Sequence, residues 1–255
     1  MIKSHRLRQN LAADRPSFGM IVNFDSPWLV DAAGLIGFDF VLLDAEHGPL
    51  SPAIVEEMIR AAEAADMSAL VRVPANVPHE ILRYLDIGAV GIQVPHIDTA
   101  QEAKAGADAM RYPPLGTRGL AAITRAANYG MTVTPKEYVA TANREVAFLP
   151  MVETQRAVDN VEAIASTPGV DALIIGPGDL SVSMGFGGDR NAPPVVKAIE
   201  RILACGKSHN KPVSLPAANM AQAKECLSLG AKIIQFPAIN FIVGHGREFL
   251  KSLKA

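Results

Sequence analysis

Short apolar runs alternate with amphipathic segments along almost the whole chain. Residues 38–46, FDFVLLDAE, are apolar almost throughout, which is typical of a strand buried on both faces. The segment 51–66 then has apolar residues at helical spacing, and Ser51 stands before a proline as a helix N-cap. Ser26 is placed in the same way before a helix over 27–37.

The same alternation of expected strands and helices extends to both ends of the chain. Strands are expected over residues 18–24, 38–46, 68–74, 89–97, 146–153, 170–176, 211–217 and 231–239. Helices are expected over residues 27–37, 51–66, 79–88, 99–110, 155–166, 194–210, 220–230 and 243–255, with further helical segments at 4–16 and 135–145. Residues 111–130 interrupt the rhythm, and 176–189 reads as a loop.

Strands that alternate with helices imply parallel pairing and right-handed crossovers. Eight such units in 255 residues, without a break in composition, predict one (β/α)8 TIM barrel domain over 1–255. An open doubly wound sheet is the alternative, but the Gly-x-Gly-x-x-Gly turn expected after its first strand is missing.

Composition narrows the possible partners. The chain is 49% apolar and 20% charged with a net charge of −2, so no nucleic acid or anionic membrane is expected to bind it. Cys205 and Cys226 lie in expected helices and are interpreted as packed thiols of a reducing compartment, without metal-ligand spacing. No signal peptide or membrane-length apolar run is recognised, so the protein is expected to be cytoplasmic.

In this fold, active sites lie at the carboxyl ends of the strands. Strands two to six each end in charged or polar side chains, whereas strands one, seven and eight end in few ionisable side chains. The groups concerned are Asp44, Glu46, His47, Arg72, Gln93, His96, Glu153 and Asp179.

Glu153 and Asp179 follow the fifth and sixth strands, and neighbouring strands lie roughly 4.8 Å apart. Two carboxylates so placed suit a hard cation such as Mg²⁺ or Mn²⁺. The alternative is that both carboxylates only cap helices or turns. The Gly-Pro-Gly before Asp179 favours a site, because glycine lets the backbone come close to a ligand.

His47 and Arg72 each allow two interpretations. His47, between a buried strand and a helix, is either a general base or a loop histidine bonded to the backbone. Arg72 interrupts an apolar strand, where an unpaired guanidinium is costly, so it must meet a carboxylate of the protein or of a substrate. Four other histidines are interpreted as structural: His79, His96, His209 and His245.

With these residues assembled, the chain resembles the HpcH/HpaI aldolase family of metal-dependent class II aldolases. The resemblance covers nearly the whole chain. Its motifs are FDFVLLDAEHG (38–48), LVRVP (70–74), LDIGA (85–89), YPPLGTRG (112–119), PMVET (150–154) and GVDALIIGPGDLS (169–181). The resemblance implies a phosphoenolpyruvate/pyruvate-type barrel that cleaves a 4-hydroxy-2-oxo acid to pyruvate, or a close 2-oxo acid, and an aldehyde.

The resemblance also implies roles for individual residues. Glu153 and Asp179 would be the ligands of a divalent cation, Mg²⁺ or Mn²⁺, with Co²⁺ as a further candidate. His47 would be the base that removes the proton of the 4-hydroxyl group. Arg72 would hold the 2-oxo acid and stabilise the enolate, and the backbone at Gly178 and Asp179 would bind the substrate carboxylate.

Asp86 matches the family's acidic residue that raises the basicity of the histidine. Because the strand pattern puts Asp86 at the far end of the barrel, it is expected to reach a histidine only across a subunit interface. A homo-oligomer is therefore expected. The family's hexamers, trimers of dimers with exchanged C-terminal helices, agree with this expectation.

Two departures from the family pattern bear on the substrate. Met151 stands where the family usually places a glutamine, and a thioether cannot donate a hydrogen bond. The aromatic residue after the first strand is also missing, with Asn23 and Phe24 in that region instead.

Other functions compete with aldol cleavage. An oxaloacetate decarboxylase or a specialised C–C bond-forming enzyme would use the same residues, and a CoA-thioester lyase is disfavoured by the lack of a basic patch. A non-catalytic 2-oxo-acid-binding protein would not need the histidine base. The expected strand ends carry no lysine, which argues against an imine mechanism.

Overall fold

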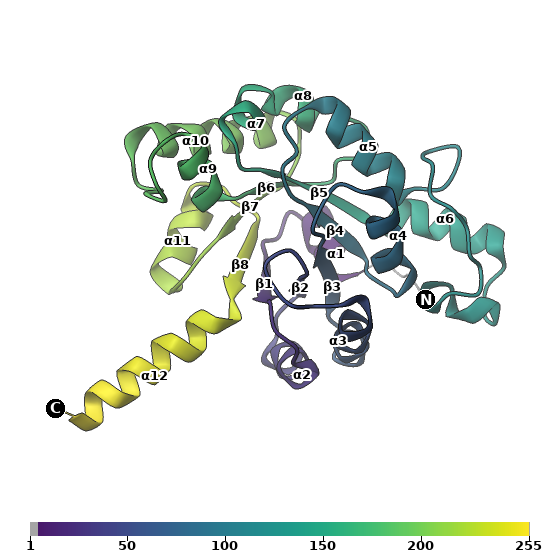
Figure 1. Cartoon of the computed structure of the whole chain (residues 1–255), viewed down its shortest axis with the longest axis horizontal. Coiled ribbons are helices and arrows are strands. Elements are labelled where there is room, and N and C mark those ends of the chain that lie inside the picture. The colour runs from purple at the N-terminus through teal and green to yellow at the C-terminus, as the bar shows by residue number, and fades with distance from the viewer. Residues whose placement is uncertain (1–4, 255) are drawn as a thin grey trace.

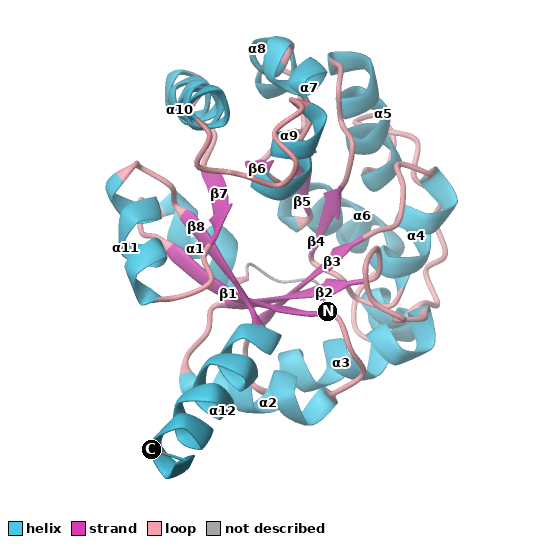
Figure 2. Ribbon diagram, turned by 60° about the vertical axis from the view of Figure 1, so that its left-hand side comes forward, coloured by secondary structure: helices cyan, strands magenta, loops and turns pink. Residues whose placement is uncertain are grey.

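Eight parallel strands close into a barrel in the computed structural model, which describes residues 5–254 (Figures 1 and 2). Each strand pairs with its neighbours in chain order, and β1 also pairs with β8, so the sheet has no edge. The strands are β1 (Ser17–Val22), β2 (Phe40–Asp44), β3 (Ser68–Arg72), β4 (Gly91–Val94), β5 (Ala147–Val152), β6 (Leu173–Ile175), β7 (Val213–Pro216) and β8 (Ile233–Pro237). The closed barrel is confirmed, and the open-sheet alternative is wrong.

Helices surround this barrel (Figure 2). They are α1 (Arg6–Ala12), α2 (Pro27–Ile36), α3 (Pro52–Ala64), α4 (Pro78–Asp86), α5 (Ala100–Met110), α6 (Pro135–Glu145), α7 (Gln155–Asp159), α8 (Val161–Ala165), α9 (Pro177–Ser183), α10 (Pro193–Ser208), α11 (Met220–Ser228) and α12 (Ala238–Lys254). A 3₁₀ helix, η1 (Arg125–Gly130), lies in the segment that interrupts the alternation.

The core has two parts, one inside the barrel and one between the strands and the helices. Inside, side chains from alternate strand positions fill the lumen, as in other (β/α)8 barrels. Leu7 of α1 joins this inner cluster from the amino-terminal end. Gly19 leaves the space that the Phe40 ring occupies, because a Cβ at position 19 would lie 2.1 Å from a ring carbon.

The helix starts predicted from N-caps are confirmed. The Ser26 hydroxyl accepts a hydrogen bond from the Leu29 amide at 3.3 Å, and Ser51 accepts one from the Ile54 amide at 3.4 Å. In both places a proline follows the cap, where its missing N–H costs no intrahelical bond. The two cysteines are free and buried, as expected of packed thiols.

Two expectations about the segments that follow β5 and β6 were wrong. Residues 176–189 are not all loop, because Pro177 starts α9 directly after the strand. The helix expected over 155–166 is two short helices that meet at Asn160. Gly-Pro-Gly is an ordinary turn signal, but proline at a first helical position also starts a helix, and here the second effect prevails.

The last helix begins at Ala238 rather than at 243, so β8 is shorter than expected. Apolar residues at 239, 241 and 242 fit both strand and helix periodicity, which explains the error. Figure 1 shows α12 extending away from the barrel, and Ala238 is its only buried residue among those described. No helix within residues 5–254 combines the length and apolar character needed to cross a membrane.

Candidate functional site at the carboxyl ends of the strands

Glu153 and Asp179 lie at the carboxyl ends of the adjacent strands β5 and β6. The register pairs Val152 with Ile175, so Glu153 comes level with Gly176, and Asp179 lies in the first turn of α9. A Cβ at position 176 would lie 2.6 Å from Glu153 Oε2. Only glycine therefore lets the backbone of β6 approach this carboxylate so closely.

The Glu153 side chain is buried and its carboxylate has few protein partners. Oε1 accepts a hydrogen bond from the His96 amide at 2.8 Å, and the His96 ring nitrogen Nδ1 lies 3.4 Å from the same oxygen. Burial raises the pKa of Glu153, and the negative charges of Asp179 and Glu46 raise it further, although the His96 amide opposes them. A cation beside this carboxylate would offset both the cost of burying its charge and the repulsion by Asp179 and Glu46.

The capping alternative for these two carboxylates is wrong. The N-cap of α7 is Thr154, whose hydroxyl accepts a hydrogen bond from the Ala157 amide at 3.0 Å. The N-cap of α9 is Gly176, so Asp179 is not its cap. Neither carboxylate is therefore a helix N-cap, although Asp179 lies in the first turn of α9.

Arg72 meets a carboxylate of the protein. Its Nε and Nη2 donate to the two oxygens of Asp44 at 2.8 and 2.6 Å, and its Nε lies 3.3 Å from Glu46 Oε2. Burial alone would raise the pKa of Asp44, but the hydrogen bonds and charge of Arg72 outweigh it and hold the pKa below its ordinary value. Within residues 5–254, Arg72 Nη1 donates no hydrogen bond to protein, so this part of the guanidinium can still serve a ligand.

The loop after β2 winds around the Asp44 carboxylate. Asp44 Oδ1 accepts hydrogen bonds from the backbone amides of Glu46 and His47, both at 3.2 Å. The His47 side chain is 60% exposed, and its Nε2 lies 3.7 Å from Glu46 Oε2. Burial raises the pKa of Glu46, although Arg72 opposes the shift. Glu46 thus connects Arg72 to His47.

Asp86 lies apart from this group. It is the last residue of α4, at the other end of the barrel, and its Oδ1 accepts a hydrogen bond from Arg118 Nη2 at 2.7 Å. The Arg118 guanidinium also lies 4.7 Å above the centre of the Tyr112 ring. Asp86 therefore contacts no histidine of its own subunit in the part of the chain that the structure describes.

Met151 points into the barrel beneath Glu153 and is buried. Its sulfur accepts a hydrogen bond from Gln93 Nε2 at 3.1 Å, and Gln93 Oε1 accepts one from Gln235 Nε2 at 3.0 Å. The interior of the barrel therefore has side-chain amide donors close to Met151. They come from β4 and β8 instead of from the residue at position 151.

Electrostatic contact joins Glu153, Asp179, Arg72 and Glu46 into one cluster, with His47 reached through Glu46. Sequence reasoning missed the contact of His96, which was interpreted as structural. Its position directly after β4 was the available signal. Glu46 was noted as a residue at a strand end, but its place between Arg72 and His47 depends on side-chain geometry.

The cluster has the parts that carbonyl chemistry on an oxo acid requires. Glu153 and Asp179 offer the oxygen ligands that Mg²⁺ and Mn²⁺ prefer. Arg72 offers donors in a fixed plane for a carboxylate or an oxo group. His47 adds an imidazole, which can accept or donate a proton.

Comparisons with known proteins agree with this chemistry. The model of the HpcH/HpaI aldolase/citrate lyase family matches residues 17–238. A 5-keto-4-deoxy-D-glucarate aldolase from Klebsiella pneumoniae is 36% identical over 230 residues, covering 90% of this chain and 89% of that enzyme. The solved structure of an HpcH/HpaI aldolase/citrate lyase family protein from Burkholderia cenocepacia has a TM-score of 0.94 at 35% identity, covering 99% of this chain and 100% of the other.

A more distant solved structure is the citrate synthase SbnG, with a TM-score of 0.87 at 25% identity, covering 98% of this chain and 97% of the other. The family match spans most of the chain, including every residue of the cluster at the strand ends. This chain therefore belongs to the HpcH/HpaI aldolase/citrate lyase family, and it is a carbon–carbon lyase of the class II aldolase type.

Proposed function

We propose that this enzyme cleaves a 4-hydroxy-2-oxo acid to pyruvate, or a close 2-oxo acid, and an aldehyde. The observation that carries the proposal is the buried Glu153 carboxylate, held beside Asp179 and Arg72 with a single backbone hydrogen-bond donor. The Klebsiella relative is named as an aldolase of 5-keto-4-deoxy-D-glucarate, so a sugar-derived oxo acid is the first substrate to test.

Class II aldolases generally depend on a divalent cation, and the donor set at the mouth of the barrel fits one. Glu153 Oε2 faces Gly176 across a space that no larger residue would leave, and Asp179 adds a second oxygen ligand. Oxygen donors of this kind suit Mg²⁺ or Mn²⁺, with Co²⁺ as a further candidate. When bound, the cation supplies a Lewis acid that stabilises negative charge on the 2-oxo group.

The remaining roles belong to residues of this chain. Arg72, held in place by Asp44, directs its free Nη1 to the 2-oxo group and stabilises the enolate charge as the C3–C4 bond breaks. The first N–H groups of α9, at Gly178 and Asp179, have no intrahelical partner and bind the substrate carboxylate. The exposed His47 takes the proton of the 4-hydroxyl group.

Met151 affects the same pocket because, unlike a glutamine, it offers no hydrogen-bond donor. Its sulfur accepts a hydrogen bond from the Gln93 side-chain amide, so one N–H of that amide is occupied and does not face a ligand. The floor beneath the oxo acid is therefore less polar than one with a glutamine at position 151, which favours an apolar group on the 2-oxo acid there.

Release of a 2-oxo acid from 5-keto-4-deoxy-D-glucarate tests the proposal. Cleavage is expected in the presence of Mg²⁺ or Mn²⁺, because the two carboxylates bind no substrate oxygen without a cation. Turnover should fall at least about 100-fold with a chelator and return when metal is restored. The 2-oxo acid is measured with a coupled lactate dehydrogenase assay. Cleavage that is unchanged by the chelator would contradict the proposed metal role.

A second function is favoured by the likeness to a citrate synthase. The same cluster could form a C–C bond to a 2-oxo acid, or remove CO₂ from oxaloacetate, because both reactions pass through a stabilised enolate. Metal-dependent loss of oxaloacetate, together with no cleavage of any 4-hydroxy-2-oxo acid, would favour this second function.

We also propose that the chain forms hexamers, as trimers of dimers, in which α12 packs on a neighbouring subunit. In the single chain, α12 leaves Phe249 64% and Leu253 68% exposed, and α2 leaves Leu35 79% and Ile36 73% exposed. Apolar surfaces of this extent usually mark an interface. The assembly also gives Asp86 a route to the histidine of another subunit, which its own chain does not offer.

Introducing charge on α12 tests this assembly. The double substitution of Phe249→Glu and Leu253→Glu should shift the mass in solution from the oligomer towards smaller species. Each buried large apolar side chain contributes about 1.5–3 kcal/mol, and a charge there adds a desolvation cost. The mass is measured by light scattering after gel filtration. Lys251→Glu, on another face of the same helix, is the control and should leave the mass unchanged. A wild-type chain that is already monomeric would contradict the proposal.

A further inference from the structure

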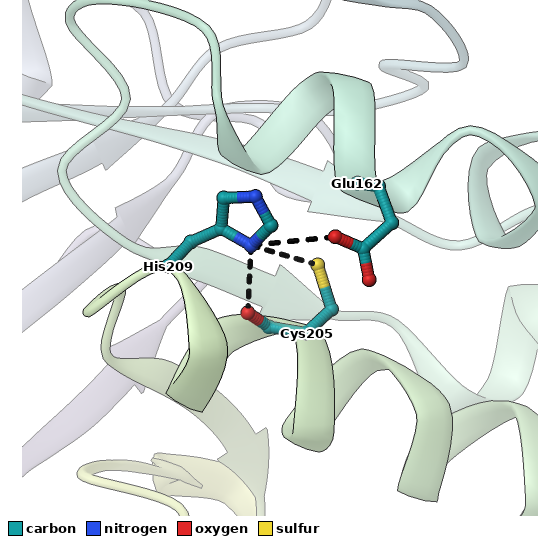
Figure 3. Close-up of side chains that lie close together, drawn as sticks. All are labelled: Glu162, Cys205 and His209. Atoms are coloured by element: carbon teal, nitrogen blue, oxygen red, sulfur yellow. Dashed lines mark hydrogen bonds and ion pairs between the residues drawn. The ribbon is translucent and has the colours of Figure 1, made fainter.

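A second group of metal-ligating side chains lies away from the mouth of the barrel. Glu162 comes from α8, Cys205 from α10, and His209 is the C-cap residue of α10 (Figure 3). One ligand atom from each residue lies within 4.8 Å of the others, and within residues 5–254 this is the only such group of three. The proposed aldol reaction uses none of the three residues.

The spacing of the atoms matches a tetrahedral metal site. His209 Nδ1 lies 3.8 Å from Cys205 Sγ and 3.4 Å from Glu162 Oε2. From ordinary bond lengths to zinc, tetrahedral ligands lie about 3.6 Å apart for sulfur and nitrogen, and about 3.4 Å apart for nitrogen and oxygen. Small movements of the exposed Glu162 side chain are therefore enough to complete the geometry.

The ligand types select the metal. A thiolate, an imidazole and a carboxylate suit Zn²⁺, whereas Mg²⁺ prefers oxygen ligands alone. The site also lies at the carboxyl end of α10, where the helix dipole and the last carbonyl groups favour a positive charge. This group therefore differs in chemistry from the oxygen ligands at the mouth.

The contacts of His209 and Cys205 can also be explained by the capping of α10. His209 Nδ1 lies 3.2 Å from the Cys205 carbonyl oxygen and can donate a proton to it as a helix cap. Burial, and then the Glu162 carboxylate, raise the pKa of the Cys205 thiol to about 12. Metal binding would move the Nδ1 proton to Nε2 and release the thiol proton. The Ser208 hydroxyl would keep its 2.9 Å bond to the same carbonyl.

We propose that Glu162, Cys205 and His209 bind one Zn²⁺ ion, with a fourth position open to water. The ion connects α8, in the segment that follows Glu153, with α10, in the segment that follows Asp179. Because α10 also packs against α7 and α9, the bound ion restrains both segments that lead away from the mouth. The proposed role of the ion is this restraint, and the site does not depend on the proposed aldol reaction.

Cobalt replaces zinc in the test because a cysteine thiolate bound to Co²⁺ gives a charge-transfer absorption in the near ultraviolet. Metal-depleted protein is first saturated with Mg²⁺, which fills oxygen-ligand sites, and is then titrated with Co²⁺. We expect the band to reach its maximum at one Co²⁺ per chain, and added Zn²⁺ should remove it. A wild-type protein without this band would overturn the proposal.

Variants identify the ligands. Cys205→Ser should abolish the band, and His209→Asn should weaken Co²⁺ binding at least about 100-fold, more than the 10–100-fold typical of residues that only orient a ligand. Cys226→Ser changes the other buried cysteine and should keep the band. Circular dichroism tests whether each variant is folded. His209→Asn, at the end of its helix, remains informative if Cys205→Ser fails to fold.

Two further results keep this proposal separate from the proposed function. Glu153→Gln should leave the band intact, because Glu153 belongs to the other site. Equal bands in the Cys205→Ser and Cys226→Ser variants, or equal Co²⁺ affinity in wild type and His209→Asn, would overturn the assignment of the ligands.

Discussion

Glu153→Gln is expected to lower turnover of the aldol substrate by about 1,000-fold while the fold becomes no less stable. The loss follows from the several kcal/mol of charge stabilisation that a bound cation supplies, where each 1.4 kcal/mol is a factor of ten in rate. Stability should hold because burial and the neighbouring Asp179 and Glu46 already raise the pKa of Glu153. A neutral amide of the same shape removes that unfavourable charge.

The measurement combines steady-state kinetics, Mn²⁺ binding by calorimetry and thermal unfolding of the metal-free protein. Glu145→Gln is the matched control, because Glu145 is also buried but lies before β5, at the other end of the barrel. Its side chain pairs with Arg144 at 2.7 Å, so the control should lose stability and keep its turnover. A Glu153→Gln variant that binds Mn²⁺ as tightly as wild type would contradict the proposed ligand role.

Arg72→Lys is expected to lower kcat/KM by about 100-fold or more, with most of the loss in kcat. Lysine keeps a positive charge near Asp44 and Glu46 but loses the planar fork that holds Asp44 and leaves Nη1 free. Removing a donor aimed at a developing negative charge typically costs 100–1,000-fold in kcat. Arg72→Ala is less informative, because it leaves the buried Asp44 unpaired and costs about 3–5 kcal/mol of stability.

Arg111→Lys is the matched control for Arg72→Lys. Arg111 is also buried and bonded to an aspartate, Asp171, at 3.0 Å, but it lies at the amino-terminal end of the barrel. Its replacement should change thermal stability and leave kcat and KM unchanged. Equal losses of kcat in the two variants would assign the effect of Arg72 to stability alone and would remove its proposed role in catalysis.

Much of the barrel could be predicted from the sequence because its signals are local. Ser26 and Ser51 mark helix starts through bonds that span only three residues, and the apolar run before Asp44 needs only to be buried on both faces. Boundaries failed where two local signals competed. Proline at 177 could end a strand or begin α9, and the apolar residues after Pro237 fitted two periods.

The candidate site was predicted less completely. Its strand-end residues follow from the rule that active sites of these barrels lie at the carboxyl ends of the strands. The sequence left open whether Arg72 meets a protein carboxylate or a substrate, and the structure shows Asp44 as its partner. The position of His96 after the fourth strand places it near the mouth, but its contact with Glu153 also depends on the path of the chain after β4.

By itself, the sequence determined the barrel, its eight strands and the position of Glu153 and Asp179 at strand ends. These follow from periodicity, which acts between near neighbours, and from the alternation of strands with helices, which implies parallel pairing. Only the tertiary structure decided which charges lie together, as in Arg72 with Asp44 and Glu46, and in the group of Glu162, Cys205 and His209. Such contacts join residues from different helices and strands. The distances between these side chains depend on tertiary packing, which the local sequence pattern does not determine.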